Sequence, residues 1–120
     1  TTAYSFGDDE KQLGEYAWFD GNSGGKTHPV GQKKPNPFGL FDMQGNVWEW
    51  CSDWYGESYP NTKGIVIDPK GPRTGSNRVI RGGGWDYVAV ACRSAFRVLA
   101  DPGYRYDYLG FRLVRVGRIP

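Results

Sequence analysis

Two carboxylates, Asp42 and Glu49, lie seven residues apart on either side of a Gly45-Asn46 turn signal. In a compact loop their oxygens can converge with main-chain carbonyl oxygens, which is the kind of ligand set that calcium accepts. A metal-free arrangement accounts for the same residues, with Asp42 capping a turn and Glu49 paired with an arginine. The spacing alone leaves both possibilities open.

Thiol and imidazole groups are scarce in this chain, which has only Cys51, Cys92 and His28. Two cysteines without Cys-x-x-Cys spacing and a single histidine do not build a zinc site. The cysteines either form one disulfide or remain buried thiols, and the sequence does not decide between these states. We find no Ser/His/Asp set that would indicate a hydrolytic triad.

Length and composition predict one small domain, residues 1–120, rich in loops. Aromatic residues make up 16% of the chain and there are 18 glycines, so large rings are expected to hold together irregular backbone. No apolar run approaches the roughly 18 residues of a membrane span. No leader pattern is found at the start, and the compartment cannot be predicted.

Charge is balanced overall but unevenly distributed. The net charge is +2, which argues against a nucleic-acid or anionic-membrane partner. Residues 71–120 contain all nine arginines and no lysine. Because the planar guanidinium stacks on rings and forks to carboxylates, we interpret these arginines as internal scaffolding rather than a polyanion site.

The elements expected to position these residues are a few short, mostly antiparallel strands joined by long structured loops. Strands are predicted at residues 78–80, 91–96 and 109–116, and no long amphipathic helix is found. Three tryptophans, Trp48, Trp50 and Trp54, fall within seven residues. Such a cluster is more typical of a core than of a sugar-stacking platform.

Several motifs occur in order along the chain: NPFGLFDMQGNVWEW (36–50), DWY (53–55), RVIRGGGW (78–85), CRSAFR (92–97) and GFR (110–112). Together they resemble the signature of the formylglycine-generating-enzyme (sulfatase-modifying factor) family. The resemblance implies an α+β, C-type lectin-like fold, loop-rich with short antiparallel strands. Family domains carry a further stretch upstream, so the chain is expected to be the C-terminal part of such a domain.

The resemblance implies a structural Ca²⁺ bound by side-chain oxygens of Asp42 and Glu49 and by the carbonyls of Gly45 and Val47. Enzymatic family members also use two cysteines after the GGGW motif to bind copper(I), since paired soft thiolates select that ion. Here the first of those positions is Tyr87, and only Cys92 lies near the second. We therefore expect no copper, no catalytic residues and no enzyme activity.

Residues 85–112 show neither helical nor strand periodicity, and positions that match the family alternate with positions of no consistent character. This layout resembles the variable proteins of diversity-generating retroelements, in which a reverse transcriptase substitutes at adenines. The fourteen inconsistent positions are the predicted ligand-binding residues: Asp86, Tyr87, Val88, Val90, Ala91, Phe96, Val98, Leu99, Ala100, Gly103, Tyr104, Tyr106, Asp107 and Tyr108.

Residue types at these positions agree with diversification from asparagine codons, which end in C or T. Such codons never become Lys, Glu, Gln, Met or Trp, and none of these five types occurs at the fourteen positions. Chance absence has a probability of about one in ten at ordinary composition. Four tyrosines and one phenylalanine among them favour recognition, as in antibody loops. The alternative is that the aliphatic positions are core and residues 104–108 an ordinary surface loop.

The leading hypothesis is a non-catalytic protein that binds a protein or other macromolecular ligand, and we expect a monomer. Two alternatives remain: a formylglycine-generating-type oxidase or degenerate relative acting on a cysteine of a protein substrate, and a fixed accessory binding module.

Overall fold

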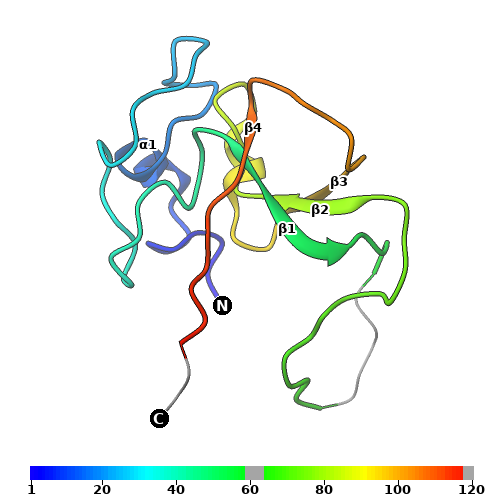
Figure 1. Cartoon of the computed structure of the whole chain (residues 1–120). Helices are drawn as coiled ribbons and strands as arrows, with labels where there is room; N and C mark the ends of the chain where they lie inside the picture. Colours follow the sequence, from blue (N-terminus) through cyan, green and yellow to red (C-terminus); the bar gives the residue numbers. More distant parts are fainter. Residues whose placement is uncertain (59–63, 118–120) are drawn as a thin grey trace.

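A four-stranded sheet in the order β3-β2-β1-β4 forms the framework of the computed structural model, which describes residues 1–58 and 64–117 (Figure 1). The helical pieces are single turns. In chain order the elements are η1 (Glu10–Gln12), α1 (Leu13–Tyr16), β1 (Trp48–Trp54), β2 (Arg78–Arg81), η2 (Ala89–Cys92), β3 (Arg97–Ala100) and β4 (Leu109–Gly110). No helix in the described ranges has the length and apolar character needed to cross a bilayer.

The sheet is mixed. β2 pairs antiparallel with both β1 and β3, through partners such as Trp50 with Ile80 and Val79 with Leu99. β4 pairs parallel with β1, with Trp48 opposite Leu109. The predicted α+β, loop-rich fold is confirmed, with one parallel strand pair among the antiparallel ones.

Two of the three predicted strands differ from the structure. Residues 89–92 form the 3₁₀ turn η2, in which the Ala91 and Arg93 N–H groups donate to the carbonyls of Val88 and Val90. Strand β3 begins only at Arg97. The segment 109–116 pairs only at Leu109–Gly110, and beyond it Leu113 and Val114 are more than 80% exposed. Alternating apolar residues favour an extended backbone there, but a ladder needs a neighbouring strand.

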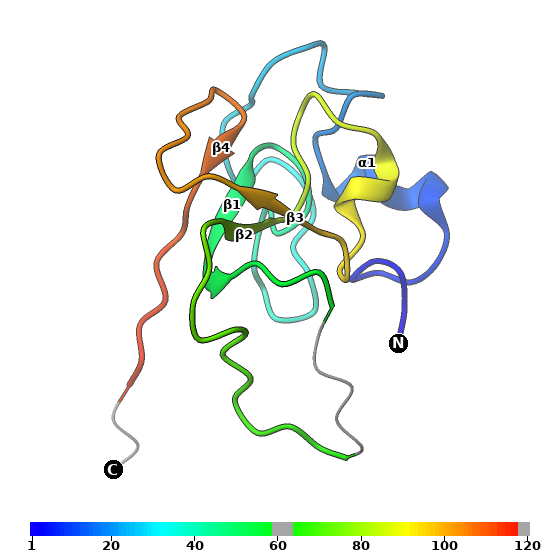
Figure 2. The same cartoon turned by 90° about the vertical axis from the view of Figure 1, so that its right-hand side faces the viewer.

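Two clusters of buried side chains meet at η2. The first contains Tyr4, Leu13, Ala17 and Cys92, and the second contains Trp48, Ile80, Ala91 and Ala100. Because the neighbours Ala91 and Cys92 belong to different clusters, this single turn joins the N-terminal helices to the sheet. Figure 2 shows η2, in yellow, beside α1.

Two arginines of the C-terminal half lie over aromatic rings, as the scaffolding interpretation predicts for them. The guanidinium of Arg78 lies 3.5 Å from the ring centroid of Trp54, and that of Arg97 lies 4.7 Å from the ring of Tyr55. These contacts hold the sheet against the ends of its loops by cation–π attraction.

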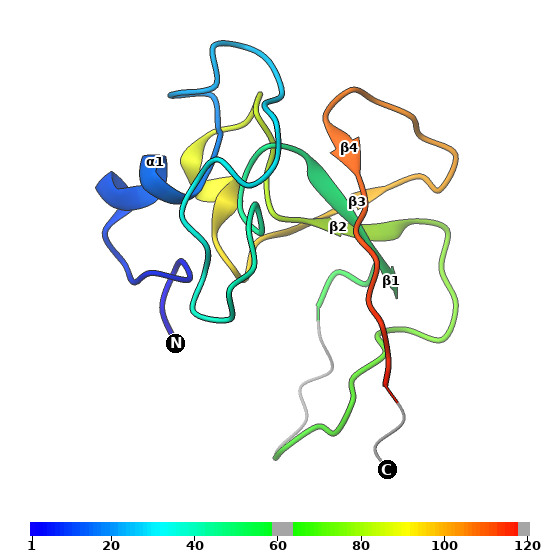
Figure 3. The ribbon, with the colours of Figure 1, turned by 60° about the vertical axis from the view of Figure 1, so that its left-hand side comes forward.

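The loop of residues 101–108 projects from the sheet between β3 and β4. It lies on the side away from α1, as Figure 3 shows in orange. This arrangement leaves the loop beside one face of the sheet and free of the N-terminal cluster.

Candidate functional site

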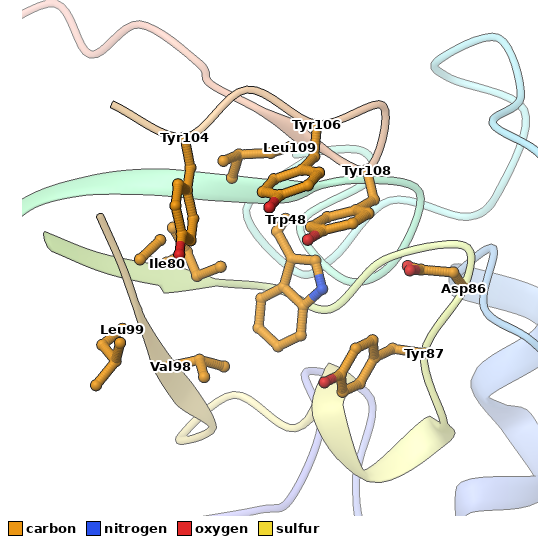
Figure 4. Close-up of a pocket in the computed structure, with 11 residues that line it drawn as sticks. Trp48, Ile80, Asp86, Tyr87, Val98, Leu99, Tyr104, Tyr106, Tyr108 and Leu109 are labelled. Carbon is orange, nitrogen blue, oxygen red and sulfur yellow. The ribbon is translucent and has the colours of Figure 1, made fainter. Parts of the chain in front are cut away.

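A hollow of about 200 Å³ opens between the sheet and the 101–108 loop (Figure 4). Its wall combines residues from β1 and β2, the loop after β2, β3, the 101–108 loop and β4. The lining residues are Trp48, Ile80, Asp86, Tyr87, Val98, Leu99, Ala100, Tyr104, Tyr106, Tyr108 and Leu109. We refer to this hollow as the tyrosine pocket.

Trp48 forms the floor of the tyrosine pocket and is only 2% exposed. The ring of Tyr87 meets it edge-on, with centroids 5.4 Å apart and planes at 85°. Gly84 lets the backbone approach this indole, because a Cβ there would lie 3.0 Å from Trp48 Cδ1. The floor is therefore part of the folded core and not a mobile side chain.

Three tyrosines at alternate positions build the facing wall. Tyr106 stacks on Tyr108 with centroids 4.9 Å apart, and Tyr104 meets Tyr106 edge-on at 5.4 Å. A turn at Asp101 starts the loop, since its carboxylate accepts from the Gly103 N–H at 2.8 Å. At the other end the Trp48 N–H donates to the Tyr108 carbonyl at 2.7 Å. The backbone is thus fixed at both ends while the rings face the hollow.

The phenol groups of the tyrosine pocket are unengaged within the chain. Among the described residues, the hydroxyls of Tyr87, Tyr104, Tyr106 and Tyr108 make no hydrogen bond to protein groups. Burial raises the pKa of Tyr108, and the nearby Tyr106 and the carboxylate of Asp86 raise it further. This phenol therefore remains neutral and able to donate at physiological pH.

Eight of the fourteen predicted ligand-binding residues line the tyrosine pocket, although they come from three separate segments. Val88, Val90, Gly103 and Asp107 are exposed but lie outside the lining. Ala91 is fully buried in the sheet cluster, and Phe96 packs against that cluster. Because these two side chains fill the core, their positions contribute to packing and not to the pocket surface.

Sequence reasoning missed three residues of the pocket: Trp48, Ile80 and Leu109. They lie on β1, β2 and β4, and each belongs to or packs against the buried sheet cluster. The apolar character of these positions predicts burial equally well whether or not they also border a cavity. Only the order of strands brings them beneath the loop.

A second hollow, of about 430 Å³, contains all four predicted calcium ligands: Asp42, Gly45, Val47 and Glu49. Asp42 is 7% exposed, and its Oδ2 accepts from the Gly31 N–H at 2.9 Å. Its Oδ1 is buried with no hydrogen-bond partner in the described part of the chain. An unpaired buried carboxylate oxygen is costly, and a cation would satisfy it.

Glu49 is held by Arg112 in this second hollow. The Arg112 Nε and Nη2 donate to the two carboxylate oxygens of Glu49, both at 2.6 Å. The same guanidinium donates to the carbonyls of Phe41 and Asp42. Asp42 thus fits a cation as it stands, whereas Glu49 would share its oxygens between Arg112 and the ion. No cluster of three or more His, Cys, Asp or Glu lies within residues 1–58 and 64–117, so carbonyl oxygens would complete the set.

Comparison with known families identifies the domain. Residues 2–116 match the family described as sulfatase-modifying factor enzyme 1-like domain. The chain belongs to this family. The membership confirms the resemblance seen in the motifs of the sequence.

Proteins with similar sequences carry names of different activities. The chain is 43% identical over 89 residues to a formylglycine-generating enzyme of Streptomyces coelicolor, covering 72% of this chain and 28% of that protein. It is 44% identical over 90 residues to serine/threonine-protein kinase pkn1 of Chlamydia pneumoniae, covering 74% of this chain and 14% of that protein. The chain thus spans less than a third of the length of these relatives.

A solved structure is similar over most of this family domain. Treponema denticola variable protein 1 superposes with a TM-score of 0.85 at 44% identity, covering 92% of this chain and 40% of that one. The resemblance to variable proteins is confirmed by this likeness in both fold and sequence.

The cysteines of this family member are both free thiols. Cys92 is fully buried, and burial together with the charge of Asp20 raises its pKa to about 12. Cys51 lies half-buried on β1, and burial raises its pKa as well. Neither thiol is poised as a thiolate, the form that binds soft metals.

Proposed function

We propose that this domain is a non-catalytic recognition module in which the tyrosine pocket binds a protein or other macromolecular ligand. The observation that carries the proposal is the convergence of eight irregularly spaced sequence positions on one hollow. These positions were predicted from the sequence and its resemblance to variable proteins, and they come from the 86–87, 98–100 and 104–108 segments. The likeness to a variable protein supports the same conclusion.

The exposure of the predicted ligand-binding side chains supports the proposal that these positions are diversified. Tyr87, Leu99, Tyr104 and Tyr106 are between 46% and 52% exposed. Val88 and Val90 are 52% and 42% exposed, which argues against the alternative that they are core. Side chains at this depth contact a ligand and can change without loss of the core. We therefore propose that the domain is a variable protein of a diversity-generating retroelement.

Sequencing many copies of the gene and its flanks from the source population tests this proposal. Substitutions should cluster at codons 86–108, at adenines of a nearby near-repeat beside a reverse-transcriptase gene. Codons for Gly82 and Arg112 provide the fixed reference within the same reads. If codons 86–108 are as invariant as these two, diversification is excluded.

A formylglycine-generating-type oxidase is the second candidate, because an enzyme so named is 43% identical to this chain. It is less well supported, since Tyr87 occupies one thiol position and Cys92 is sealed in the core. The assay is copper(I) titration with oxidation of a cysteine peptide as readout. Turnover that is lost in Cys92→Ser but retained in Cys51→Ser would establish the enzyme.

We further propose that a structural calcium ion occupies the second hollow, held by Asp42, Glu49 and the carbonyls of Gly45 and Val47. The ion would supply charge that satisfies the unpaired Asp42 oxygen. Added calcium should raise the melting temperature and chelator should lower it, as expected for a ligand of the native state. Asp42→Ala and Glu49→Ala should remove that response, with Asp101→Ala as the control. A melting temperature that chelator does not change would contradict the proposal.

A further inference from the structure

The lining of the tyrosine pocket carries one kind of charge. Asp86 is its single carboxylate, and no Lys, Arg or His is among the described residues that line it. Arg105 lies between Tyr104 and Tyr106 in sequence but is not part of the lining. Any ionic ligand group entering the pocket therefore meets only negative charge.

Aromatic rings surround the space beside Asp86. In Figure 4, Tyr106 and Tyr108 lie above the Trp48 indole and Tyr87 lies below it, with the Asp86 carboxylate at one side. The faces of such rings carry negative potential and attract cations, most strongly when water is excluded. A cation placed here would lie beside aromatic rings and a carboxylate together.

The electrostatic potential at this wall is negative and also favours a positively charged ligand group. Besides burial and Tyr106, the carboxylates of Asp86 and Asp107 raise the pKa of the Tyr108 phenol. A neutral apolar group would gain contact with the rings but would desolvate Asp86 without pairing it. An anionic group would be repelled. A cation gains from the rings and from the carboxylate together.

Size limits the ligand group to a single side chain. The hollow measures about 200 Å³, whereas sites for drug-sized ligands measure roughly 300–1,000 Å³. We infer that the tyrosine pocket of this copy binds a basic side chain of its ligand, arginine in preference to lysine. The planar guanidinium stacks on aromatic faces and forks to a carboxylate, which the compact ammonium group does not. This inference rests on the proposed recognition function.

Panning the full chain against a random-peptide display library tests the inference. Enriched peptides should share an arginine at a fixed position, and a citrulline in its place should weaken binding by about tenfold or more, the range of a desolvated cation–π and ion-pair contact. Asp86→Asn should remove the preference for arginine over citrulline. Asp107→Asn, on the 101–108 loop and outside the lining, should change affinity by less than about twofold, as expected of a rim charge.

Ring variants separate stacking from hydrogen bonding. Tyr106→Phe keeps the aromatic face and should retain most of the affinity for the arginine peptide, whereas Tyr106→Leu should lose it. Enriched peptides that need Tyr106 but contain no basic residue would overturn the inference and leave the recognition function standing. Recovery of no peptide whose binding depends on the pocket tyrosines would contradict both.

Discussion

The tyrosine pocket and the loop of residues 42–49 use their side chains in opposite ways. In the 42–49 loop, polar side chains bind backbone: Gln44 Nε2 donates to the Cys92 carbonyl at 2.9 Å, and Asn46 makes two hydrogen bonds with the main chain of His28. Gln44 and Asn46 are each 6% exposed. In the tyrosine pocket, the phenol hydroxyls make no hydrogen bond to the described part of the chain, and the rings line the hollow.

The two loops differ in which groups determine the path of the backbone. The 42–49 loop is irregular, yet its own polar groups specify its path, so a change there alters the fold. The 101–108 loop obtains its path from bonds at its two ends. Under the proposed function its side chains are available for binding, and the same backbone would present many different sets of them.

The sharpest test of this contrast is Gly45→Ala. Gly45 has a φ of +77°, and a Cβ there would lie 2.4 Å from the Trp18 carbonyl oxygen. The backbone at Gly45 and the backbone at Trp18 cannot separate without disrupting the 42–49 loop. We therefore expect the free energy of unfolding to fall by more than about 4 kcal/mol, or the variant to fail to fold. Urea unfolding provides the measurement.

Gly39→Ala is the matched control for that substitution. Its φ is +76°, but a Cβ there meets nothing within 4 Å. The left-handed backbone alone costs roughly 1–2 kcal/mol. Equal losses in the two variants would show that the 42–49 loop is not a packed element.

Trp48→Ala should have the next largest effect, since it empties the floor shared by the core and the pocket. Removal of a buried tryptophan costs about 3–5 kcal/mol. Tyr106→Ala, on the facing wall and 47% exposed, should cost less than about 1 kcal/mol. Thermal unfolding of both variants tests whether the floor is structural and the wall is not. Similar losses would mean that the wall is structural.

A smaller effect is expected from alkaline pH. The Cys92 pKa is raised from 9.0 to about 12, so the unfolded chain loses this proton first. The stabilisation is fully present below pH 9 and is lost as pH rises toward 12. Between pH 9 and pH 11 the loss should be on the order of 2 kcal/mol. Urea unfolding at a series of pH values measures it.

Cys92→Ala should make that pH dependence shallower without abolishing it. The pKa of Tyr4 is also raised to about 12, mainly by burial and its hydrogen bond to Glu10, and contributes in the same direction. An unchanged slope in the variant would show that the thiol is accessible to water in the native state.

The smallest changes in stability should come from serine substitutions at Val88, Leu99 and Tyr104. All three are 48–52% exposed, and surface changes usually stay within about 0.5 kcal/mol. Ala100→Ser, at the buried position next to Leu99 on β3, is the control, and its melting temperature should fall further than those of the three exposed variants. Losses above 1 kcal/mol at the exposed positions would place them in the scaffold.

The sequence predicted the features that depend on neighbouring residues along the chain. The strand Arg78–Arg81 follows from its β-branched residues, and most of the pocket follows from positions that obey no periodicity. The partner of Glu49 could not be identified, because Arg112 reaches it only through the parallel pairing of β4 with β1. Cys92 likewise has the sequence context of a strand residue, but it ends a 3₁₀ turn that packs closely against Gly83.

We expect the exposed residues of the recognition surface to be a separate set from the buried residues that determine the fold. Two six-position libraries of the full chain, sorted for protease resistance on a display system, test it directly. One library randomises the exposed positions Tyr87, Val88, Val90, Leu99, Tyr104 and Tyr106, and the other randomises the buried positions Leu13, Gln44, Asn46, Trp48, Val79 and Cys92. Most members of the first library should fold and almost none of the second. Equal surviving fractions would contradict the account.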